Sequence, residues 1–298
     1  MSFVPYGTLW PTLAGYQASF GGYTFGQGTN LEIREWQGLD MPAVRSGDSG
    51  RPRDHGMFRG LDVMAGREPS LTGDLHNLTG TFEAAEAALA NATIPGGSED
   101  TPLFVNLPGW GTLACMARVR KRQMPREIQL SLGKLGKVAL LWAADDPRLY
   151  AQTQQASVVP PSKTAGFSLP MSFNLNFGGG SVAGSLSVTN AGNIETRPLL
   201  IVEGPCEDPS ITNVTAEGSP NLTFNLPIAF GAKLVIDTDL HTATYYGPGA
   251  TVGSTRLGTL VYGSQWFTLA AERTSNIQFL AATSEGKLSV QWASAYIT

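Results

Sequence analysis

Much of the second half of the chain consists of segments in which apolar and polar residues alternate. Leu186 and Val188 alternate with small polar residues over 185–189, and Leu288, Val290 and Trp292 repeat the pattern over 287–292. A further segment places a set of apolar residues on one face: Leu222, Phe224, Leu226, Ile228 and Phe230. A period of two with one apolar face is typical of antiparallel sheets, and turn signals spaced roughly 8 to 12 residues apart favour a β-sandwich. We therefore expect Trp292 to lie in a core.

The first half combines strand patterns with one helix. Residues 20–26 indicate a turn between two strands, and strand signals return over 103–143, where arginines at 118, 120 and 122 alternate with Val119 and Lys121. The segment FEAAEAALA predicts a helix over 82–90, with Thr81 as its N-cap. The chain as a whole is predicted to be mainly β.

A polar, proline-containing stretch separates the two halves. Residues 151–170 have the composition of a linker, so we place a domain boundary near residue 155. This gives an N-terminal β-domain with a short helix over 1–155 and a C-terminal β-sandwich over 156–298. Inside the first domain, residues 45–67 are rich in glycine and arginine and have no helical period, which predicts a long loop or irregular hairpin. Its arginines are Arg45, Arg51, Arg53, Arg59 and Arg67.

Composition narrows the function. The 298 residues are 42% hydrophobic and 15% charged, and their 35 glycines and 19 prolines imply many turns. A formal net charge of −4 is unusual for a nucleic-acid-binding chain, so we expect no sequence-specific nucleic acid binding. No apolar run has the length of a transmembrane helix and the N-terminal residues do not resemble a signal peptide, so we expect neither membrane insertion nor export by the general secretory route.

The tetrapeptide at 47–50, Gly-Asp-Ser-Gly, surrounds the nucleophile in chymotrypsin-like proteases and raises the question of a hydrolase. A serine nucleophile needs a nearby base, and in that fold the histidine precedes the serine, whereas His55, His76 and His241 all follow Ser49. We interpret the tetrapeptide as a turn, whose composition it matches. We expect no enzymatic activity, no catalytic residue and no cofactor.

Metal and disulfide sites are also disfavoured. Cys115 and Cys206 lack zinc-ligand spacing, and two cysteines make no disulfide framework. Buried reduced thiols are the favoured interpretation, and a single bridge is the alternative. Asp145 and Asp146 have no third ligand at suitable spacing, so we interpret them as a turn that ends a strand.

The most distinctive stretch is VTNAGNIETRP at 188–198, followed by IVEGP at 201–205 and PSITN at 209–213. It resembles the distal tail (Dit) proteins of siphophages, whose C-terminal domain carries an Asn-x-Gly-Asn…Thr…Pro…Ile-x-Gly-Pro run. The segments LVIDT at 234–238 and LLWAADDPRLY at 140–150 are also similar to that family. The resemblance extends over 140–298 and is loose in the N-terminal half. Its motif residues are Asn190, Gly192, Asn193, Pro198, Gly204 and Pro205.

These motif residues predict backbone shape and no catalysis. Glycine and asparagine at 190–193 suit a loop that needs positive φ angles. Pro198 suits the start of a strand, where a missing N–H is tolerated. Gly204 and Pro205 suit its end.

The resemblance implies an architecture and a place in the virion. The N-terminal domain is expected to form a hexameric ring and the C-terminal domain a galectin-like sandwich. The ring would join the distal end of the tail tube to the tail-tip or baseplate proteins that attach to the host, and it would leave a lumen for DNA. The implied partners are other copies of this chain, the tail tube protein and a tail-tip hub protein, after synthesis in the host cytoplasm.

Two hypotheses attach residues to that role. The arginines of 45–67 are expected to contact carboxylates of a neighbouring subunit, because a closed ring needs head-to-tail contacts and guanidinium groups bind carboxylates in pairs of hydrogen bonds. The alternative function is a carbohydrate- or receptor-binding tail module. In that case a host cell-wall saccharide would contact exposed aromatic residues such as Tyr245, Tyr246, Trp266 or Trp292. Alternation favours a core position for Trp292, whereas Tyr245 and Tyr246 lie beside a turn.

Overall fold

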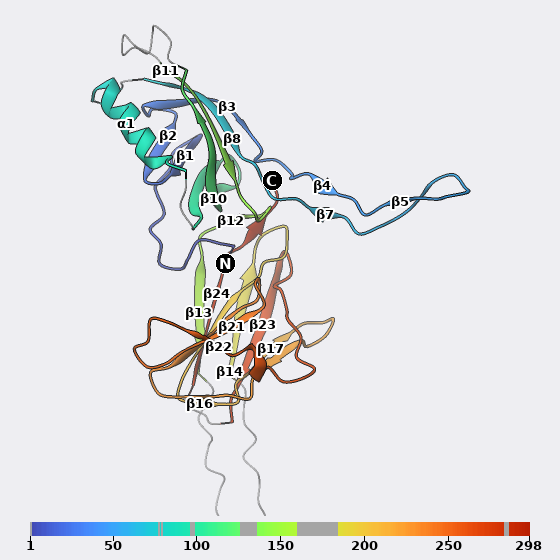
Figure 1. Ribbon diagram of the computed structural model, residues 1–298. Helices are drawn as coiled ribbons and strands as arrows, with labels where there is room; N and C mark the ends of the chain where they lie inside the picture. The colour runs from blue at the N-terminus through green and yellow to red at the C-terminus, as the bar shows by residue number, and fades with distance from the viewer. Residues whose placement is uncertain are drawn as a thin grey trace, which may run out of the picture. The chain divides into compact units, whose positions relative to one another are not determined.

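The structure is a computed structural model, and it confirms a mainly β protein. It describes residues 2–76, 78, 80–95, 99–125, 136–159, 184–282 and 286–298. The chain divides into two compact units (Figure 1). The N-terminal unit comprises Ser2–Gln152 together with Tyr296–Thr298, and the C-terminal unit comprises Thr153–Ala295.

The N-terminal unit is built on an antiparallel sheet in the order β2-β1-β9-β10-β11-β8-β3. The strand bounds are β1 Gln17–Phe20, β2 Tyr23–Gly26, β3 Leu31–Gln37, β8 Ser70–Leu75, β9 Thr101–Leu107, β10 Gly111–Gln123 and β11 Gly136–Ala143. A short strand, β12 (Leu149–Tyr150), also pairs with β10. Strand β10 is long enough to pair with β9 along its first half and with β11 along its second half.

A register shift between Val119 and Lys121 changes the pattern predicted for β10. Val119 is buried, but Lys121 is exposed and does not share the face of Val119. A bulge of this kind places two residues of one strand opposite one residue of its partner, which ends strict alternation. The strand predicted for these residues is present, and the register shift accompanies the change from a buried Val119 to an exposed Lys121.

Three aromatic rings organise the core of this unit. Trp142 on β11 is fully buried and stacks on Phe25 of β2 and on Trp36 of β3, at centroid distances of 5.9 Å in each case. Phe25 and Trp36 stack on one another at 5.8 Å. Strands β2 and β3 are the two edge strands of this sheet order. The sheet is therefore strongly curved, since residues of both edge strands contact Trp142.

The helix α1 (Phe82–Ala92) begins and ends with side-chain caps. Thr81 Oγ1 accepts a hydrogen bond from the N–H of Ala84 at 3.2 Å, as predicted for the N-cap. At the other end Arg122 donates to the carbonyl of Ala90 at 2.7 Å, which places a cation beside the negative end of the helix dipole. The buried residues Phe82, Ala85 and Leu89 form the face that packs on the core.

The C-terminal unit contains two main antiparallel sheets. The larger sheet has the order β13-β24-β15-β20-β21-β22 and the smaller has β14-β23-β17-β18. The bounds are β13 Gln154–Val158, β14 Gly184–Asn190, β15 Leu199–Glu203, β17 Ser210–Val214, β18 Asn221–Thr223, β20 Lys233–Asp237, β21 Thr242–Tyr246, β22 Ser254–Thr255, β23 Arg273–Leu280 and β24 Lys287–Trp292. Beside them lie the pair β16 (Cys206–Glu207) and β19 (Pro227–Ile228) and the 3₁₀ turn η1 (Leu257–Thr259). Strand β25 (Ala295–Tyr296) pairs with β12.

Alternate residues of these strands fill a shared core. Val188 and Ile277 from the smaller sheet and Leu234 and Val290 from the larger sheet are fully buried in one cluster. Trp292 is buried in the same cluster, as the alternation predicted. Phe230 is an exception to its predicted face and is 82% exposed, because β19 ends at Ile228 and Phe230 lies in the following turn.

The predicted linker is in part a strand. Gln154–Val158 form β13, which pairs with β24 in the register Gln154↔Trp292. The polar side chains of Gln154, Gln155 and Ser157, which suggested a linker, are exposed on this edge strand. The division between the units falls between Gln152 and Thr153. The remainder of the predicted linker, from 160 to 170, lies outside the described residues. No helix in the described part of the chain is long and apolar enough to cross a membrane.

Candidate functional site

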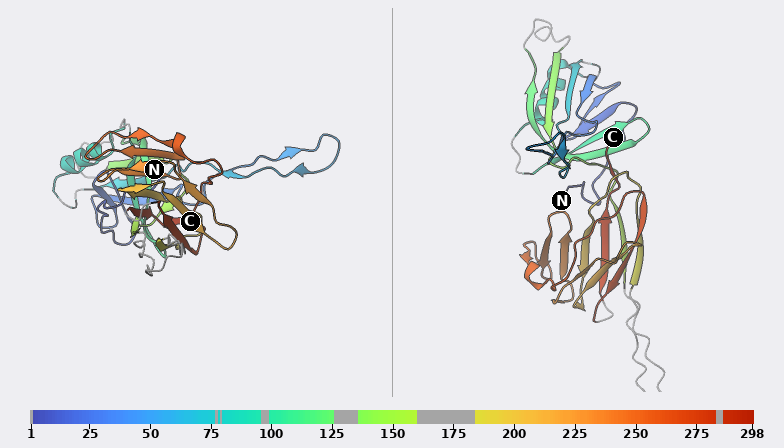
Figure 2. Two further views of the ribbon diagram at one scale, coloured as in Figure 1. Left: turned by 90° about the horizontal axis from the view of Figure 1, so that it is seen from below. Right: turned by 90° about the vertical axis from the view of Figure 1, so that its right-hand side faces the viewer.

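The most prominent exposed feature is a hairpin arm, which we define as residues 41–66. Strand β4 (Val44–Arg45) pairs with β7 (Val63–Met64), and β5 (Ser49–Gly50) pairs with β6 (Met57–Phe58). The arm projects from the N-terminal unit as a narrow two-stranded ribbon (Figure 2). An isolated ribbon of this kind buries little of its own surface.

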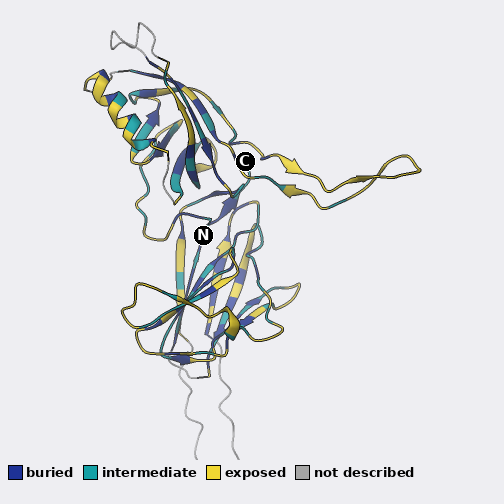
Figure 3. Ribbon diagram, viewed as in Figure 1, coloured by how far each residue is buried: buried dark blue, intermediate teal, exposed yellow. Residues whose placement is uncertain are grey.

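Most residues of the arm are exposed (Figure 3), and several of them are large and apolar. Met57 is 61% exposed, Phe58 56% and Leu61 79%. Burying such side chains against another surface is favourable by roughly 1.5–3 kcal/mol for each large residue. Exposed apolar residues gathered on one projecting element are typical of a protein–protein contact.

The arm also carries charge. Its sequence contains four arginines and three aspartates, which gives a formal net charge of +1. Arg51 lies 3.6 Å from the carboxylate of Asp54, and its guanidinium lies over the ring of Phe58 at 5.2 Å. Arg45, Arg53 and Arg59 are exposed. The arm therefore offers cationic and apolar groups together.

Arg67 has a different role from the arm arginines. It is only 2% exposed, and its Nη1 donates to the carbonyl oxygens of Leu39 and of Asp40, the latter at 2.7 Å. Its Nε and Nη2 donate to the carbonyl oxygen of Pro147. Burial lowers the pKa of Arg67. The expectation that Arg67 contacts a neighbouring subunit is corrected: it ties the base of the arm to the body of its own unit.

A cavity of about 530 Å³ lies at the base of the arm. Pro42 and Ala65 line it from the arm, and Arg120 and Asp145 line it from the body. Asp145 also receives hydrogen bonds from Arg118, at 2.7 and 2.9 Å, and these hold the pKa of Asp145 below its ordinary value. Asp145 is thus an ion-pair partner on this surface.

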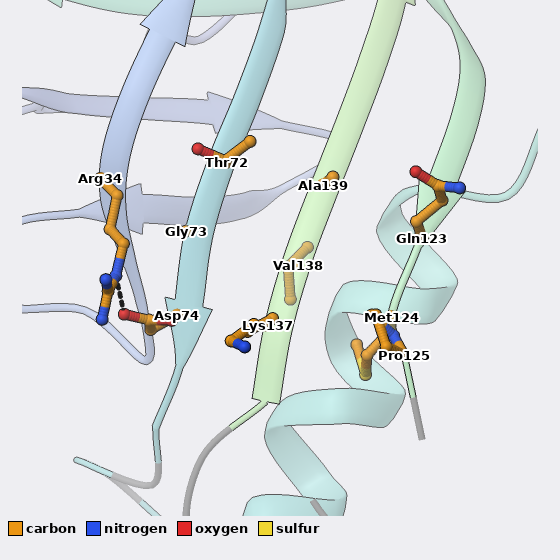
Figure 4. A pocket seen from close by; sticks show the side chains of 10 residues that line it. All are labelled: Arg34, Thr72, Gly73, Asp74, Gln123, Met124, Pro125, Lys137, Val138 and Ala139. Carbon is orange, nitrogen blue, oxygen red and sulfur yellow. Dashed lines mark hydrogen bonds and ion pairs between the residues drawn. The ribbon is translucent and has the colours of Figure 1, made fainter. Parts of the chain in front are cut away.

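A second cavity of about 500 Å³ lies against β3, β8 and β11 (Figure 4). Arg34 and Asp74 face one another across neighbouring strands and form an ion pair. Lys137 and Val138 line the cavity from β11, and Met124 lines it from beyond the end of β10. Because the ion pair is satisfied within the chain, we assign no ligand to this cavity.

The Gly-Asp-Ser-Gly segment lies within the arm. Ser49 belongs to β5 and pairs with Phe58, so the segment is part of a ribbon strand and the predicted turn is wrong. Within the described residues, Ser49 makes no hydrogen bond to a histidine. The structure therefore provides no base for this serine in the isolated chain.

Other candidate chemistry has no support in the part of the chain that the structure describes. No group of three or more potential metal ligands occurs among these residues. Cys115 and Cys206 are both free and buried, so the interpretation as buried thiols is confirmed. Burial raises the pKa of Cys115 to about 12 and that of Cys206 to about 11, which keeps both thiols protonated near neutral pH.

The motif residue Asn190 is completely buried and links three segments of the C-terminal unit. Its Nδ2 donates to the carbonyls of Ile194, Leu269 and Ala270, at 2.8, 3.2 and 3.3 Å. Its Oδ1 accepts from the backbone N–H groups of Gly192 and Ala295, at 3.0 and 3.3 Å. Every hydrogen-bonding atom of the amide is used, so this side chain acts as a structural crosslink.

Gly192 is required for a reason other than the one predicted. It does not have a positive φ angle, and neither does Asn193, so the expected loop conformation is wrong. A methyl group at Gly192 would overlap the backbone of Ala295, whose carbonyl oxygen lies against its Cα. The glycine therefore permits two segments far apart in sequence to touch.

The proline positions of the motif flank one strand. Pro198 directly precedes β15, and its carbonyl accepts a hydrogen bond from Thr238 at 2.7 Å. Gly204 and Pro205 directly follow β15, and the peptide bond between them is cis. A side chain at Gly204 would overlap the carbonyls of Ile228 and Ala229.

The two tyrosines predicted to contact a saccharide are half-buried. Arg256 lies over the ring of Tyr245 at 5.7 Å. Lys233 lies over the ring of Tyr246 at 5.4 Å, and the backbone of Gly253 packs closely against the same ring. Saccharide contact by either tyrosine stays a prediction, and both rings already have cationic neighbours.

Comparison with solved structures shows which proteins share this fold. The structure of the Dit protein from phage SPP1, described as a paradigm of the hub adsorption apparatus in phages that infect Gram-positive bacteria, matches with a TM-score of 0.62. The match covers 95% of this chain and 99% of that chain, at 12% sequence identity. This chain has the Dit fold. The resemblance seen in the sequence is thereby confirmed at the level of the fold, over both units.

Two structures of the phage P2 baseplate, in its activated conformation with calcium and with strontium, also share this fold. Their TM-scores are 0.52 and 0.51, each at 8% identity and with 93% of this chain covered. No protein-family model matches the sequence, and no curated protein matches it. The similarity is therefore one of fold, and the sequences share few identical residues.

Proposed function

We propose that this protein is a structural subunit of a phage tail tip, where copies of it form a ring at the distal end of the tail tube. The observation that carries the proposal is the agreement in fold with the SPP1 Dit protein over both units. Agreement across a two-unit chain is a stronger indication than a shared sandwich, because single sandwiches serve many unrelated functions.

The arm supports a role in assembly. A closed ring needs a surface on each subunit that fits a different surface on the next subunit. The exposed side chains of Met57 and Phe58 provide the apolar part of such a contact, and Arg51 and Arg53 provide groups that pair with carboxylates. We propose that this arm contacts the neighbouring subunit.

The proposed ring has six copies and a lumen through which DNA passes. Its other partners are the tail tube protein on one side and the tail-tip or baseplate hub on the other, in the finished virion. We propose that the protein has no enzymatic activity. The residues that stand out in the sequence, such as Asn190, Gly192 and Arg67, cross-link or closely pack the backbone in this structure.

Native mass spectrometry of the full chain tests the ring. The chain mass is 31.6 kDa, so six copies have a mass of 6 × 31.6, about 190 kDa. A species of that mass, with a central opening in negatively stained electron micrographs, is the expected result. A chain that stays monomeric over a wide concentration range, and also in mixtures with tail tube protein, would contradict the proposal.

A further inference from the structure

The cavity at the base of the arm, which we call the base cavity, has an acidic lining. Asp40, Glu68 and Asp145 are exposed at this cavity. Two guanidinium groups, those of Arg67 and Arg120, also line it, so the lining has a formal net charge of −1. Asp145 is already held in an ion pair within the chain, whereas Glu68 has no ion-pair partner among the described residues. An exposed carboxylate without a partner is available to a cationic group of another molecule.

Arg67 fixes the walls of the base cavity. Its guanidinium donates to the carbonyl oxygens of Leu39 and Asp40 on one side. Its backbone pairs with Ala144 on the other side through two hydrogen bonds of 2.8 Å each. Glu68 follows Arg67 directly in the chain, so its backbone is held by the same contacts. The carboxylates are therefore in place before a partner binds, and such preorganisation reduces the entropy lost on association.

The far end of the arm carries groups that complement this lining. Arg53 is exposed and has no ion-pair partner among the described residues. The ion pair of Arg51 with Asp54 is long, at 3.6 Å, and solvated, so it contributes little. Phe58 exposes apolar surface under Arg51, and at the base cavity Met41 is 63% exposed. Both surfaces thus combine charge with apolar side chains, and their net charges are opposite in sign.

The arm cannot fill the base cavity of its own chain. The pairing of β4 with β7 and of β5 with β6 holds the ribbon extended. Arg53 lies eleven residues beyond Pro42, and extended chain rises about 3.3 Å per residue, so roughly 35 Å separates the two. A contact between the far end of the arm and a base cavity is therefore a contact between two copies of the chain.

This reach matches the spacing expected for copies in a ring. Compact units of 100–150 residues are roughly 30–40 Å across. Equivalent positions on two adjacent units are separated by about one such width, so an arm that extends roughly 35 Å reaches from its own base cavity to that of the next unit. Each copy presents one arm and one cavity, which is the head-to-tail arrangement that a closed ring needs.

We infer that the base cavity of each copy receives the far end of the arm of the neighbouring copy, where Arg51 and Arg53 pair with the carboxylates of Asp40 and Glu68. The inference rests on the proposed ring, and it adds the acceptor surface and the direction of the contact. Complementary charges at such a contact suppress wrong partners and fix the register of the subunits.

An exchange of charge between two variants tests this contact. The reversed arm is Arg51→Glu/Arg53→Glu, and the reversed cavity is Glu68→Arg. Each variant alone places like charges at the contact and should lose the oligomer that the wild-type chain shows in native mass spectrometry. In an equal mixture the reversed arm meets the reversed cavity and the normal arm meets the normal cavity, so a ring of alternating copies should form. Assembly restored by mixing also shows that both variants are folded.

Glu217→Arg is the matched control, because it makes the same change in charge at an exposed side chain of the C-terminal unit and should keep the oligomer. An oligomer that persists in Glu68→Arg, or a mixture of the two variants that stays monomeric, overturns the inference and leaves the wild-type ring standing. A wild-type chain that forms no oligomer overturns the ring and the inference together. The two failures are therefore distinguishable.

Discussion

Arg67 and Pro147 are joined by two hydrogen bonds, although they lie eighty residues apart: Nε and Nη2 of the guanidinium donate to one carbonyl oxygen at 3.0 and 2.9 Å. With further bonds to carbonyls of 38–40, this one side chain connects three segments at the base of the arm. These hydrogen bonds fix the base of the arm to the body of the N-terminal unit.

Replacing Arg67 by alanine should destabilise the N-terminal unit by about 3–5 kcal/mol, because several buried carbonyls lose their donor at once. Arg67→Lys should recover little of this loss, since an ammonium group cannot reproduce the planar set of donors. Urea unfolding followed by tryptophan fluorescence gives the measurement. Arg120→Ala, at an exposed position of β10 outside the arm, is the control and should change the free energy of unfolding by less than about 0.5 kcal/mol. Equal effects of the two alanine variants would refute this account.

Gly192→Ala should destabilise the C-terminal unit by about 1–3 kcal/mol, since the added methyl group forces the backbone of Ala295 to move. Gly258→Ala is the matched control. Gly258 also lacks a positive φ angle, and no atom lies within 4 Å of the position that its methyl group would occupy. Thermal unfolding of both variants separates the two cases, and a Gly192→Ala protein as stable as the control would show that the close approach is unimportant.

The arm can be tested without disturbing the fold, because the residues concerned are exposed. Reversing two charges in Arg51→Glu/Arg53→Glu, or removing apolar surface in Met57→Ser/Phe58→Ser, should shift the native mass spectrum from the ring towards monomer. Circular dichroism should stay unchanged. Arg256→Glu/Arg273→Glu makes the same change in net charge on the C-terminal unit and should leave the oligomer intact. An unchanged oligomer mass in both arm variants would exclude the arm as a subunit contact.

The two thiols should be unreactive in the folded protein. The pKa of Cys115 is raised to about 12 and that of Cys206 to about 11, above the value of about 8.5 for an unfolded thiol. A raised pKa contributes stability that is fully present below about pH 8.5 and is lost as the pH rises towards the folded values. Iodoacetamide at about pH 8 should therefore modify neither cysteine until denaturant is added, because the thiolate is the nucleophile.

Ser254→Cys supplies a positive control for that experiment, since Ser254 is exposed on β22 and lies outside the arm. This introduced thiol should be alkylated in the folded state while the two native cysteines remain protected. Mass spectrometry after digestion identifies the modified positions. Rapid alkylation of Cys115 in the folded wild-type protein would mean that its surroundings open more readily than the buried position implies.

Alternation along the chain predicted the sandwich because it is a local property of strands. The burial of Val188, Val290 and Trp292 follows directly from the period of two. The pattern failed beyond the end of β19, where Phe230 is exposed. The chain turns there, and the periodicity alone does not predict where a strand ends.

The burial of Arg67 had no signal in the sequence. Arg67 has the same residue type as the exposed arm arginines and a similar glycine-rich context. Whether the side chain of an arginine is solvated or donates hydrogen bonds to buried backbone carbonyls depends on segments that are distant in the sequence.

The sequence by itself determined the mainly β character, the helix predicted over 82–90 and the motif that resembles the Dit proteins, because these depend on neighbouring residues. Only the tertiary structure decided between a loop and a hairpin for the 45–67 segment, and only it showed that Arg67 is buried and that Gly192 is needed for its contact with Ala295. Each of these depends on contacts between residues distant in the chain. Such contacts are set by how the sheets fold on one another, which no local pattern records.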